Sequence, residues 1–200
     1  MLTVNDLSDT RAGTDDDLAL IRNDDWRDAV DVPDLVVYEG DLALDDDFSA
    51  SGAALIAHGD LTVAGTVSLD ETGTLVVTGR LRCANLACEG NLEIQGDADV
   101  AETIFGCYEA GISWFHGAVR AALLVQGNHA FEYTPAQLAV TTHLQFANFR
   151  GLSVGTEAQA KAVLSDQAYA LLAPLIGLVA DGSSKGLEQL LRTDGFLRRS

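Results

Sequence analysis

The sequence predicts a mainly β fold: a single-stranded right-handed β-helix (β-solenoid) with an N-terminal cap and a C-terminal helical cap. A short unit, Gly-x-apolar-x-apolar, recurs through the middle of the chain. Corresponding positions return after about 14 to 21 residues, the length of one solenoid coil. The chain has 200 residues, 48% of them hydrophobic, and can therefore bury one substantial core. The right-handed sense follows the precedent of parallel β crossovers.

The repeated unit predicts a strand, a corner and a further strand. Apolar and polar residues alternate within each unit, as in a strand with one buried face, and the leading glycine supplies the backbone freedom that a sharp corner requires. The units begin at Gly40, Gly59, Gly65, Gly73, Gly79, Gly90, Gly96 and Gly117. We expect the stacked coils to bury an interior column of Leu42, Leu44, Leu61, Val63, Leu75, Val77, Leu81, Cys83, Leu86, Cys88, Leu92 and Ile94.

Three segments are expected to form one structural unit: an acidic N-terminal cap over residues 1–34, the β-helix over 35–133 and a C-terminal helical cap over 134–200. The last segment opens with Thr134-Pro-Ala-Gln137, a capping-box pattern with proline at the first helical position. Apolar residues then recur at three- and four-residue steps at Val163, Leu164, Ala168, Leu171, Leu172, Leu175 and Ile176. This pattern predicts a helical lid over the coil stack.

The N-terminal cap carries its own helix signal. Thr14 precedes a run of carboxylates, which suits a capped helix start. Trp26, Val30 and Val32 are expected to cover the first coil. Pro33 marks the entry into the strands.

The charge of the chain limits its partners. The net charge is −18, which would repel nucleic acid and anionic membrane surfaces, so neither is an expected partner. Residues 1–50 carry 15 Asp and Glu against three Arg, a local net charge of −12. A protein partner with a basic surface is favoured. General acidification for solubility or for a high-salt cytoplasm is an equally open explanation.

Cellular location and thiol chemistry follow from two further features. No apolar run reaches the roughly 18 residues of a membrane span, and the N-terminus does not resemble a secretion signal, so we expect a cytoplasmic protein. Cys83, Cys88 and Cys107 form no Cys-x-x-Cys pair and have apolar neighbours. Buried thiols are therefore expected, rather than disulfides or a zinc site.

The sequence predicts no catalytic, cofactor-binding or metal-binding residue. His58, His116, His129 and His143 show neither a metal-ligand spacing nor a known nucleophile motif. A hexapeptide-type acyltransferase is a third reading, because pairs of glycines lie six residues apart and His58 precedes a corner. That six-residue rhythm does not persist beyond pairs.

Clustered carboxylates give the candidate partner-binding residues. They lie in two runs, Asp15, Asp16 and Asp17 in the N-terminal cap and Asp45, Asp46 and Asp47 after the first strand. Such runs can steer a basic partner and orient it. Tyr108 and Trp114 are candidate aromatic anchors, with core packing as the alternative for each.

Several segments resemble bacterial bactofilin-like, polymer-forming β-helix proteins. The resemblance covers roughly residues 35–125 and is carried by Gly40-Asp-Leu-Ala-Leu, Gly59-Asp-Leu-Thr-Val, Leu75-Val-Val-Thr-Gly-Arg-Leu-Arg-Cys and Gly90-Asn-Leu-Glu-Ile. It implies a cytoskeletal subunit that assembles end to end through bare solenoid ends, without nucleotide. The long flanks of this chain depart from that family pattern.

A capped, acidic solenoid without an active site also looks like the immunity proteins that mask polymorphic bacterial toxins. The leading expectation is therefore a non-enzymatic protein-binding module, an immunity protein or antitoxin that occludes a toxin domain, present as a monomer or small homo-oligomer. The alternative is a bactofilin-like cytoskeletal or scaffold subunit. Fold analogy alone selects neither function.

Overall fold

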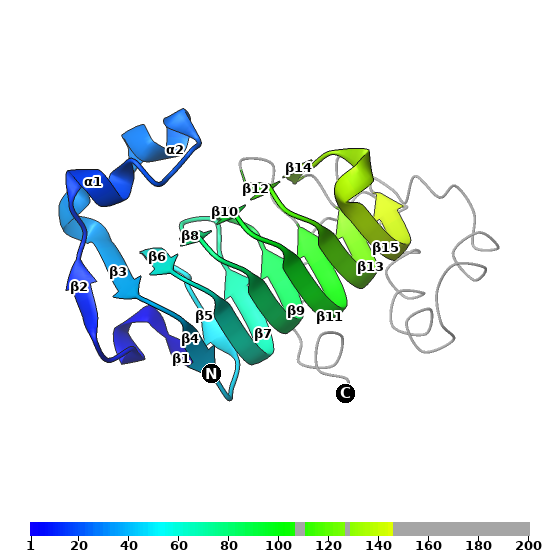
Figure 1. The fold of residues 1–200 in the computed structure, drawn as a ribbon, viewed down its shortest axis with the longest axis horizontal. Helices are drawn as coiled ribbons and strands as arrows, with labels where there is room; N and C mark the ends of the chain where they lie inside the picture. Colours follow the sequence, from blue (N-terminus) through cyan, green and yellow to red (C-terminus); the bar gives the residue numbers. More distant parts are fainter. Residues whose placement is uncertain (107–110, 127–128, 146–200) are drawn as a thin grey trace, which may run out of the picture.

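The chain folds as a mainly β solenoid of about five turns, which confirms the predicted fold class. This computed structural model describes residues 1–106, 111–126 and 129–145. The coils stack along one axis, with the N-terminal elements at one end and β15 at the other end of the described part (Figure 1). Among these residues, no helix is long and apolar enough to cross a membrane. The right-handed sense of the coils stays a prediction.

Two sheets, each running the length of the solenoid, form its walls. Sheet A consists of β1 (Leu2–Thr3), β5 (Phe48–Ser49), β7 (Leu61–Leu69), β9 (Leu81–Cys88), β11 (Ala98–Gly106), β13 (Val119–Gln126) and β15 (Leu138–Gln145), with β4 (Leu42–Leu44) also beside β7. Sheet B consists of β2 (Thr10–Ala12), β3 (Leu35–Glu39), β6 (Ala54–His58), β8 (Thr74–Val77), β10 (Asn91–Ile94), β12 (Ile112–Phe115) and β14 (Ala130–Glu132). Strands pair in parallel between coils, except that β2 pairs antiparallel with β3.

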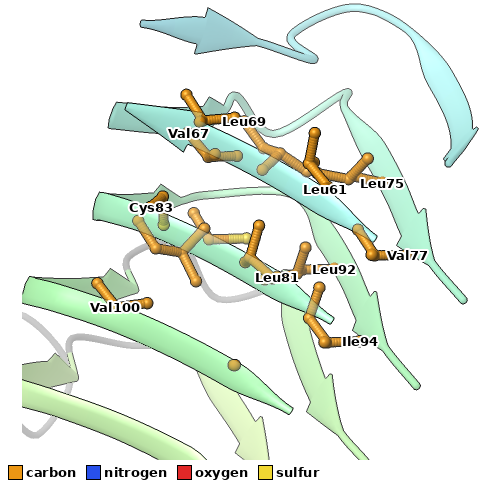
Figure 2. Packing of buried hydrophobic residues seen from close by; sticks show 14 of the residues in the cluster. Leu61, Val67, Leu69, Leu75, Val77, Leu81, Cys83, Leu92, Ile94 and Val100 are labelled. Atoms are coloured by element: carbon orange, nitrogen blue, oxygen red, sulfur yellow. The ribbon is translucent and has the colours of Figure 1, made fainter. Parts of the chain in front are cut away.

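The interior column forms as predicted. Leu61 lies in register with Leu81, and Leu75 with Leu92, so equivalent apolar residues stack on one another from coil to coil (Figure 2). All the predicted interior residues are buried except Leu44, which is partly buried against the same cluster. The period-2 alternation placed them correctly because successive side chains of a strand point to opposite faces.

Glycines at one corner of each coil make room for the neighbouring coil. A Cβ atom on Gly79 would lie 2.6 Å from the carbonyl carbon of Gly59, and one on Gly96 would lie 2.5 Å from the carbonyl oxygen of Gly79. Gly117 repeats this contact at 2.3 Å from the Gly96 oxygen. In this stack only Gly40 has a positive φ, of 88°. Close backbone approach, rather than the expected conformational freedom, therefore explains most of the repeated glycines.

Aspartates beside these glycines satisfy backbone donors at the corner. The Asp41 carboxylate accepts a hydrogen bond of 2.8 Å from the Asp60 N–H, 19 residues later. Asp60 accepts one of 2.8 Å from the Arg80 N–H, and Asp97 one of 3.0 Å from the Ala118 N–H. Carboxylates that bond to the backbone in this way join one coil to the next. Part of the acidity of the chain is thus structural.

Residues 1–12 cover the N-terminal end of the interior column. The strand β1 adds in parallel to β5, and β2 adds antiparallel to β3. Between them, η1 (Val4–Asp6) places Val4 in the core, where it is 5% exposed. The outer edges of β5 and β3 are therefore paired, whereas β4 pairs only with β7 among the described strands, and β1 and β2 are the outermost strands of their sheets.

Residues 13–34 lie across the outer face of sheet B. They form α1 (Asp15–Leu18), α2 (Asp24–Ala29) and η2 (Val32–Asp34), which Figure 1 shows on the sheet B side of the solenoid. Ile21 and Trp26 are buried in a second cluster with Val37, Ile56 and Val76, the outward residues of β3, β6 and β8. Trp26 was expected to cover the first coil. It lies in one cluster with Leu35 and Val37 of β3, in the first coil, and this cluster extends to β6 and β8 because the middle strands of sheet B are apolar on both sides.

Glu93 holds this segment to the solenoid. Its carboxylate is fully buried on the outer side of β10 and accepts a hydrogen bond of 3.0 Å from the Arg22 N–H. It also lies 3.2 Å from His116 Nε2, and Gln95 donates to it and to the carbonyl of Leu20. The buried charge is accommodated because several donors surround it.

The strands continue past residue 133, where the β-helix was expected to end. At Thr134, the backbone N–H donates to the side-chain oxygen of Gln137, as in half of a capping box. The turn that follows is only the 3₁₀ helix η3 (Pro135–Gln137), and β15 then pairs in parallel with β13. The prediction that the C-terminal helical cap begins at residue 134 is therefore wrong. The predicted helices beyond residue 145 lie outside the described residues.

Candidate functional site

The carboxylate run of α1 divides into two exposed residues and one buried residue. Asp15 and Asp16 are exposed. Asp17 is 5% exposed and receives two hydrogen bonds from the Arg11 guanidinium, of 2.6 and 2.8 Å, as well as one of 2.7 Å from the Thr14 hydroxyl. The hydrogen bonds from Arg11 hold the pKa of Asp17 well below its ordinary value. This carboxylate serves the helix cap and the ion pair with Arg11, and a contact between Asp17 and a partner stays a prediction.

The second run lies in the connection between β4 and β5. Asp45 is exposed, and Asp46 forms an ion pair of 2.9 Å with the terminal amino group of Met1. Asp47 is half-buried and accepts a hydrogen bond of 2.8 Å from the Thr66 N–H of the next coil. Asp47 therefore has a structural role, while Asp45 and Asp46 remain accessible. Figure 1 shows this connection and α1 on opposite sides of the N-terminal end, so the fold does not bring the two runs together.

The two aromatic candidates have different outcomes. Trp114 is partly buried on the outer face of sheet B, where it packs beside the second cluster and stacks on His116 at 5.5 Å between ring centroids. It thus belongs in part to the packing of that face. Tyr108 lies outside the described residues.

A concave site exists where residues 13–34 meet a corner of the solenoid. We call it the acidic crevice; its volume is about 530 Å³, and its lining includes Trp26, Asp31, Asp34, Ser51, Thr72 and Asn91. The two carboxylates flank η2, the turn that carries the chain from α2 into β3. Both are exposed, and neither has an ion-pair partner among the described residues.

Successive coils also line the acidic crevice. Ser51, Thr72 and Asn91 precede or begin the sheet B strands at neighbouring levels of the stack, and all three belong to the lining. Trp26 is 5% exposed and supplies an apolar element. Two carboxylates together with hydroxyl and amide groups form a site suited to a guanidinium or ammonium group.

The solenoid interior contains a serine–histidine pair that no sequence motif indicated. Ser113 Oγ lies 2.8 Å from His129 Nε2, and both residues are buried. The neighbouring Cys88 is also buried, and desolvation raises the pKa of its thiol to about 12. Cys83 is buried too, so the prediction of buried thiols is confirmed for both, while Cys107 lies outside the described residues. Enclosure in the core keeps this pair away from any substrate.

The acidic crevice is therefore the best candidate site of the described structure. In the sequence its carboxylates were only part of a general acidic segment, and Pro33 between them was the one local sign of a turn. Within the described ranges, no group of three or more His, Cys, Asp or Glu residues could hold a metal ion. Comparisons of the chain with protein-family models, curated proteins and solved structures found no match.

Proposed function

We propose that this protein is a non-enzymatic protein-binding module that receives a basic side chain of its partner in the acidic crevice. The observation that carries the proposal is the placement of Asp31 and Asp34 at a concave site about 530 Å³ in volume, both exposed and without an ion-pair partner among the described residues. Arginine suits such a site, because its planar guanidinium carries five donors and pairs with carboxylates in a fixed geometry.

The surrounding charge supports the same class of partner. Among the other exposed acids of this segment, Asp15, Asp16 and Asp28 also have no ion-pair partner in the described part of the chain, whereas Asp24 pairs with Arg27. With a net charge of −18 on the chain, they would raise the association rate of a basic protein and weaken binding of an acidic one. In the specific form of the proposal, the partner is a bacterial toxin domain that acts on nucleic acid and must present a basic surface. The module would then be its immunity protein or antitoxin.

The strands at the N-terminal end favour a discrete binder over a filament subunit. An end-to-end contact that continues the coils needs parallel strand edges, whereas the outermost strands here are the two-residue β1 and β2, which runs antiparallel to β3. Sedimentation and electron microscopy over a range of concentrations separate the two functions. A monomer or small oligomer is expected, and filaments would contradict the proposal.

The acidic crevice can be tested with a short probe before a partner is known. We expect tri-arginine amide to shift the NMR signal of the Trp26 indole, and the double variant Asp31→Asn/Asp34→Asn to weaken its binding about tenfold. The charge-matched control is Asp9→Asn/Glu132→Gln, which alters two exposed acids that do not line the crevice. It should weaken binding less than about twofold. Equal weakening by both double variants would show attraction by net charge alone and would remove the crevice from the proposal.

A further inference from the structure

A second candidate surface, shallow and open, lies on the outer face of sheet A. We call it the sheet A groove; its volume is about 630 Å³. Its floor contains Ala64, Ala84, Ala101 and Ala122, one from each of four neighbouring strands. The strand register shifts beside this row, between Val63 and Thr66 and at the equivalent point of β11, so the groove follows a bend in the sheet. Small side chains along the floor allow another backbone to approach closely.

The groove also collects the basic residues of the solenoid. Between residues 28 and 145 the chain has three Lys or Arg residues, Arg80, Arg82 and Arg120. Arg82 and Arg120 line the groove, and Arg80 lies beside it at 3.8 Å from Asp99. Coil stacking therefore gathers residues that are far apart in the sequence.

The ion pairs of this cluster leave one arginine, Arg82, without a partner in the described part of the chain. Arg120 forms ion pairs of 2.7 Å with Asp99 and 3.1 Å with Asp97. Arg82 is exposed and has no hydrogen-bond or ion-pair partner among the described residues. Asp60, whose carboxylate accepts a hydrogen bond from the Arg80 N–H, makes three aspartates beside the three arginines, so the cluster is neutral on a chain of −18. Arg80 Nε is buried there without a hydrogen-bond partner.

We propose that the sheet A groove binds a mainly apolar segment of a partner protein through a single carboxylate side chain. The alanine floor would receive the apolar residues, and Arg82 would pair with the carboxylate through its planar fork of donors. The charge of the whole chain selects against a polyanion, because each added negative charge is repelled by the acidic surface while only one arginine is free. This site is independent of the acidic crevice and would engage a different part of a partner.

Two matched peptides test the charge requirement. The probes are acetyl-Ala-Val-Glu-Val-Ala-amide and the same peptide with glutamine in place of glutamate, titrated by NMR into the full chain. We expect the glutamate peptide to shift the backbone amides of Ala84 and Ala101 and to bind about fivefold more tightly than the glutamine peptide. Equal binding of the two peptides, or no shift at these amides, would overturn the proposal.

Variants locate the contact. Arg82→Gln should reduce binding of the glutamate peptide to that of the glutamine peptide, and Ala101→Phe should reduce binding of both by filling the floor. Ala101 is exposed, so this larger side chain needs no space in the core. The control is Arg22→Gln, which removes an exposed arginine that does not line the groove and should change affinity less than about twofold. The same loss with Arg22→Gln as with Arg82→Gln would overturn the assignment.

A free carboxylate separates a peptide site from a small-molecule site. Hexanoate offers the charge and an apolar body without a peptide backbone, and we expect it to bind at least about tenfold more weakly than the glutamate peptide. Hexanoate binding as tight as that of the peptide would overturn the choice of a protein segment. Failure of tri-arginine at the acidic crevice would leave these measurements unaffected.

Discussion

The outer faces of sheets A and B differ although the same coils build both. On sheet B the outward residues Val37, Ile56 and Val76 are apolar, and residues 13–34 bury them. On sheet A the equivalent outward row includes Arg82 and Arg120, which are exposed. The inner faces of both sheets contribute to one interior column.

This difference teaches that the strands themselves determine where a flanking segment docks. The strand β8 reads Thr-Leu-Val-Val and is buried at every position, whereas β9 begins Leu-Arg-Cys-Ala and alternates buried with accessible residues. A parallel strand that is apolar on both sides requires cover on both sides. Residues 13–34 supply that cover for sheet B and leave sheet A available for binding.

A carboxylate introduced on each outer face should reveal the largest difference in stability between the two sheets. Ile56→Asp buries an unpaired carboxylate under the N-terminal segment and is expected to lower the free energy of unfolding by about 3–5 kcal/mol. Thr62→Asp places the same group on the open face, in register with Arg82. This variant should change the free energy of unfolding by less than about 0.5 kcal/mol. Urea unfolding of both variants measures the difference. Similar losses would mean that sheet A is also covered.

A glycine variant at the shared corner should weaken both faces together. Gly96→Ala places a Cβ atom 2.5 Å from a backbone oxygen, and we expect it to cost about 2–3 kcal/mol through overpacking. Gly52→Ala is the control: Gly52 has a φ of 66° but an open surrounding, so only the backbone conformation costs energy, about 1 kcal/mol. Hydrogen exchange should accelerate in both sheets with Gly96→Ala. A larger loss from Gly52→Ala would restore conformational freedom as the reason for the glycines.

Removing the buried carboxylate should loosen the cover of sheet B alone. Glu93→Ala deprives the Arg22 N–H of its acceptor, which we expect to cost about 1–2 kcal/mol and to accelerate exchange of that amide. Asp99→Ala removes a partly exposed ion pair on the open face and should cost less than about 1 kcal/mol. Unchanged exchange at Arg22 would show that apolar packing alone holds the segment.

The smallest expected effect is a pH dependence of the stability that the Asp17–Arg11 ion pair contributes to the segment covering sheet B. Because the pKa of Asp17 is lower in the folded than in the unfolded chain, its stabilisation is complete above about pH 4 and is lost as the pH falls further. Arg11 is 41% exposed, so solvent screening keeps the loss from Arg11→Met at pH 7 small. Chemical unfolding at pH 7 and at about pH 2 should show a smaller loss at the lower pH. Arg22→Met, which leaves Asp17 paired, is the control, and an equal loss at both pH values would contradict the assignment.

The interior column and the helix cap at Thr14 could be predicted because both signals are local. Alternation assigned the buried face of each strand, and a threonine before three aspartates indicated a helix start. The burial of Asp17 was not predictable in the same way. Its partner Arg11 lies near in sequence, but the ion pair depends on β2 lying against β3, and that antiparallel contact has no signature in the alternating pattern.

Both candidate sites required the tertiary structure. The acidic crevice combines Asp31 and Asp34 with corner residues of later coils, and the sheet A groove combines Arg82 with Arg120. These neighbours follow from the register between coils. Coil length varies along the chain, so the residues that lie side by side in neighbouring coils cannot be counted from the sequence. The register between β7 and β9 also shifts after Val63, which changes the pairing of the residues that follow.

By itself, the sequence determined that this protein is a β-solenoid with an apolar interior, because the alternation of apolar and polar residues acts within a few residues and the repeated glycines mark the corners. The tertiary structure alone decided which outer face is covered, which aspartates join the coils and which charges remain free. Those outcomes depend on contacts between distant segments, and the energy of such contacts is set by how the coils stack rather than by any local pattern.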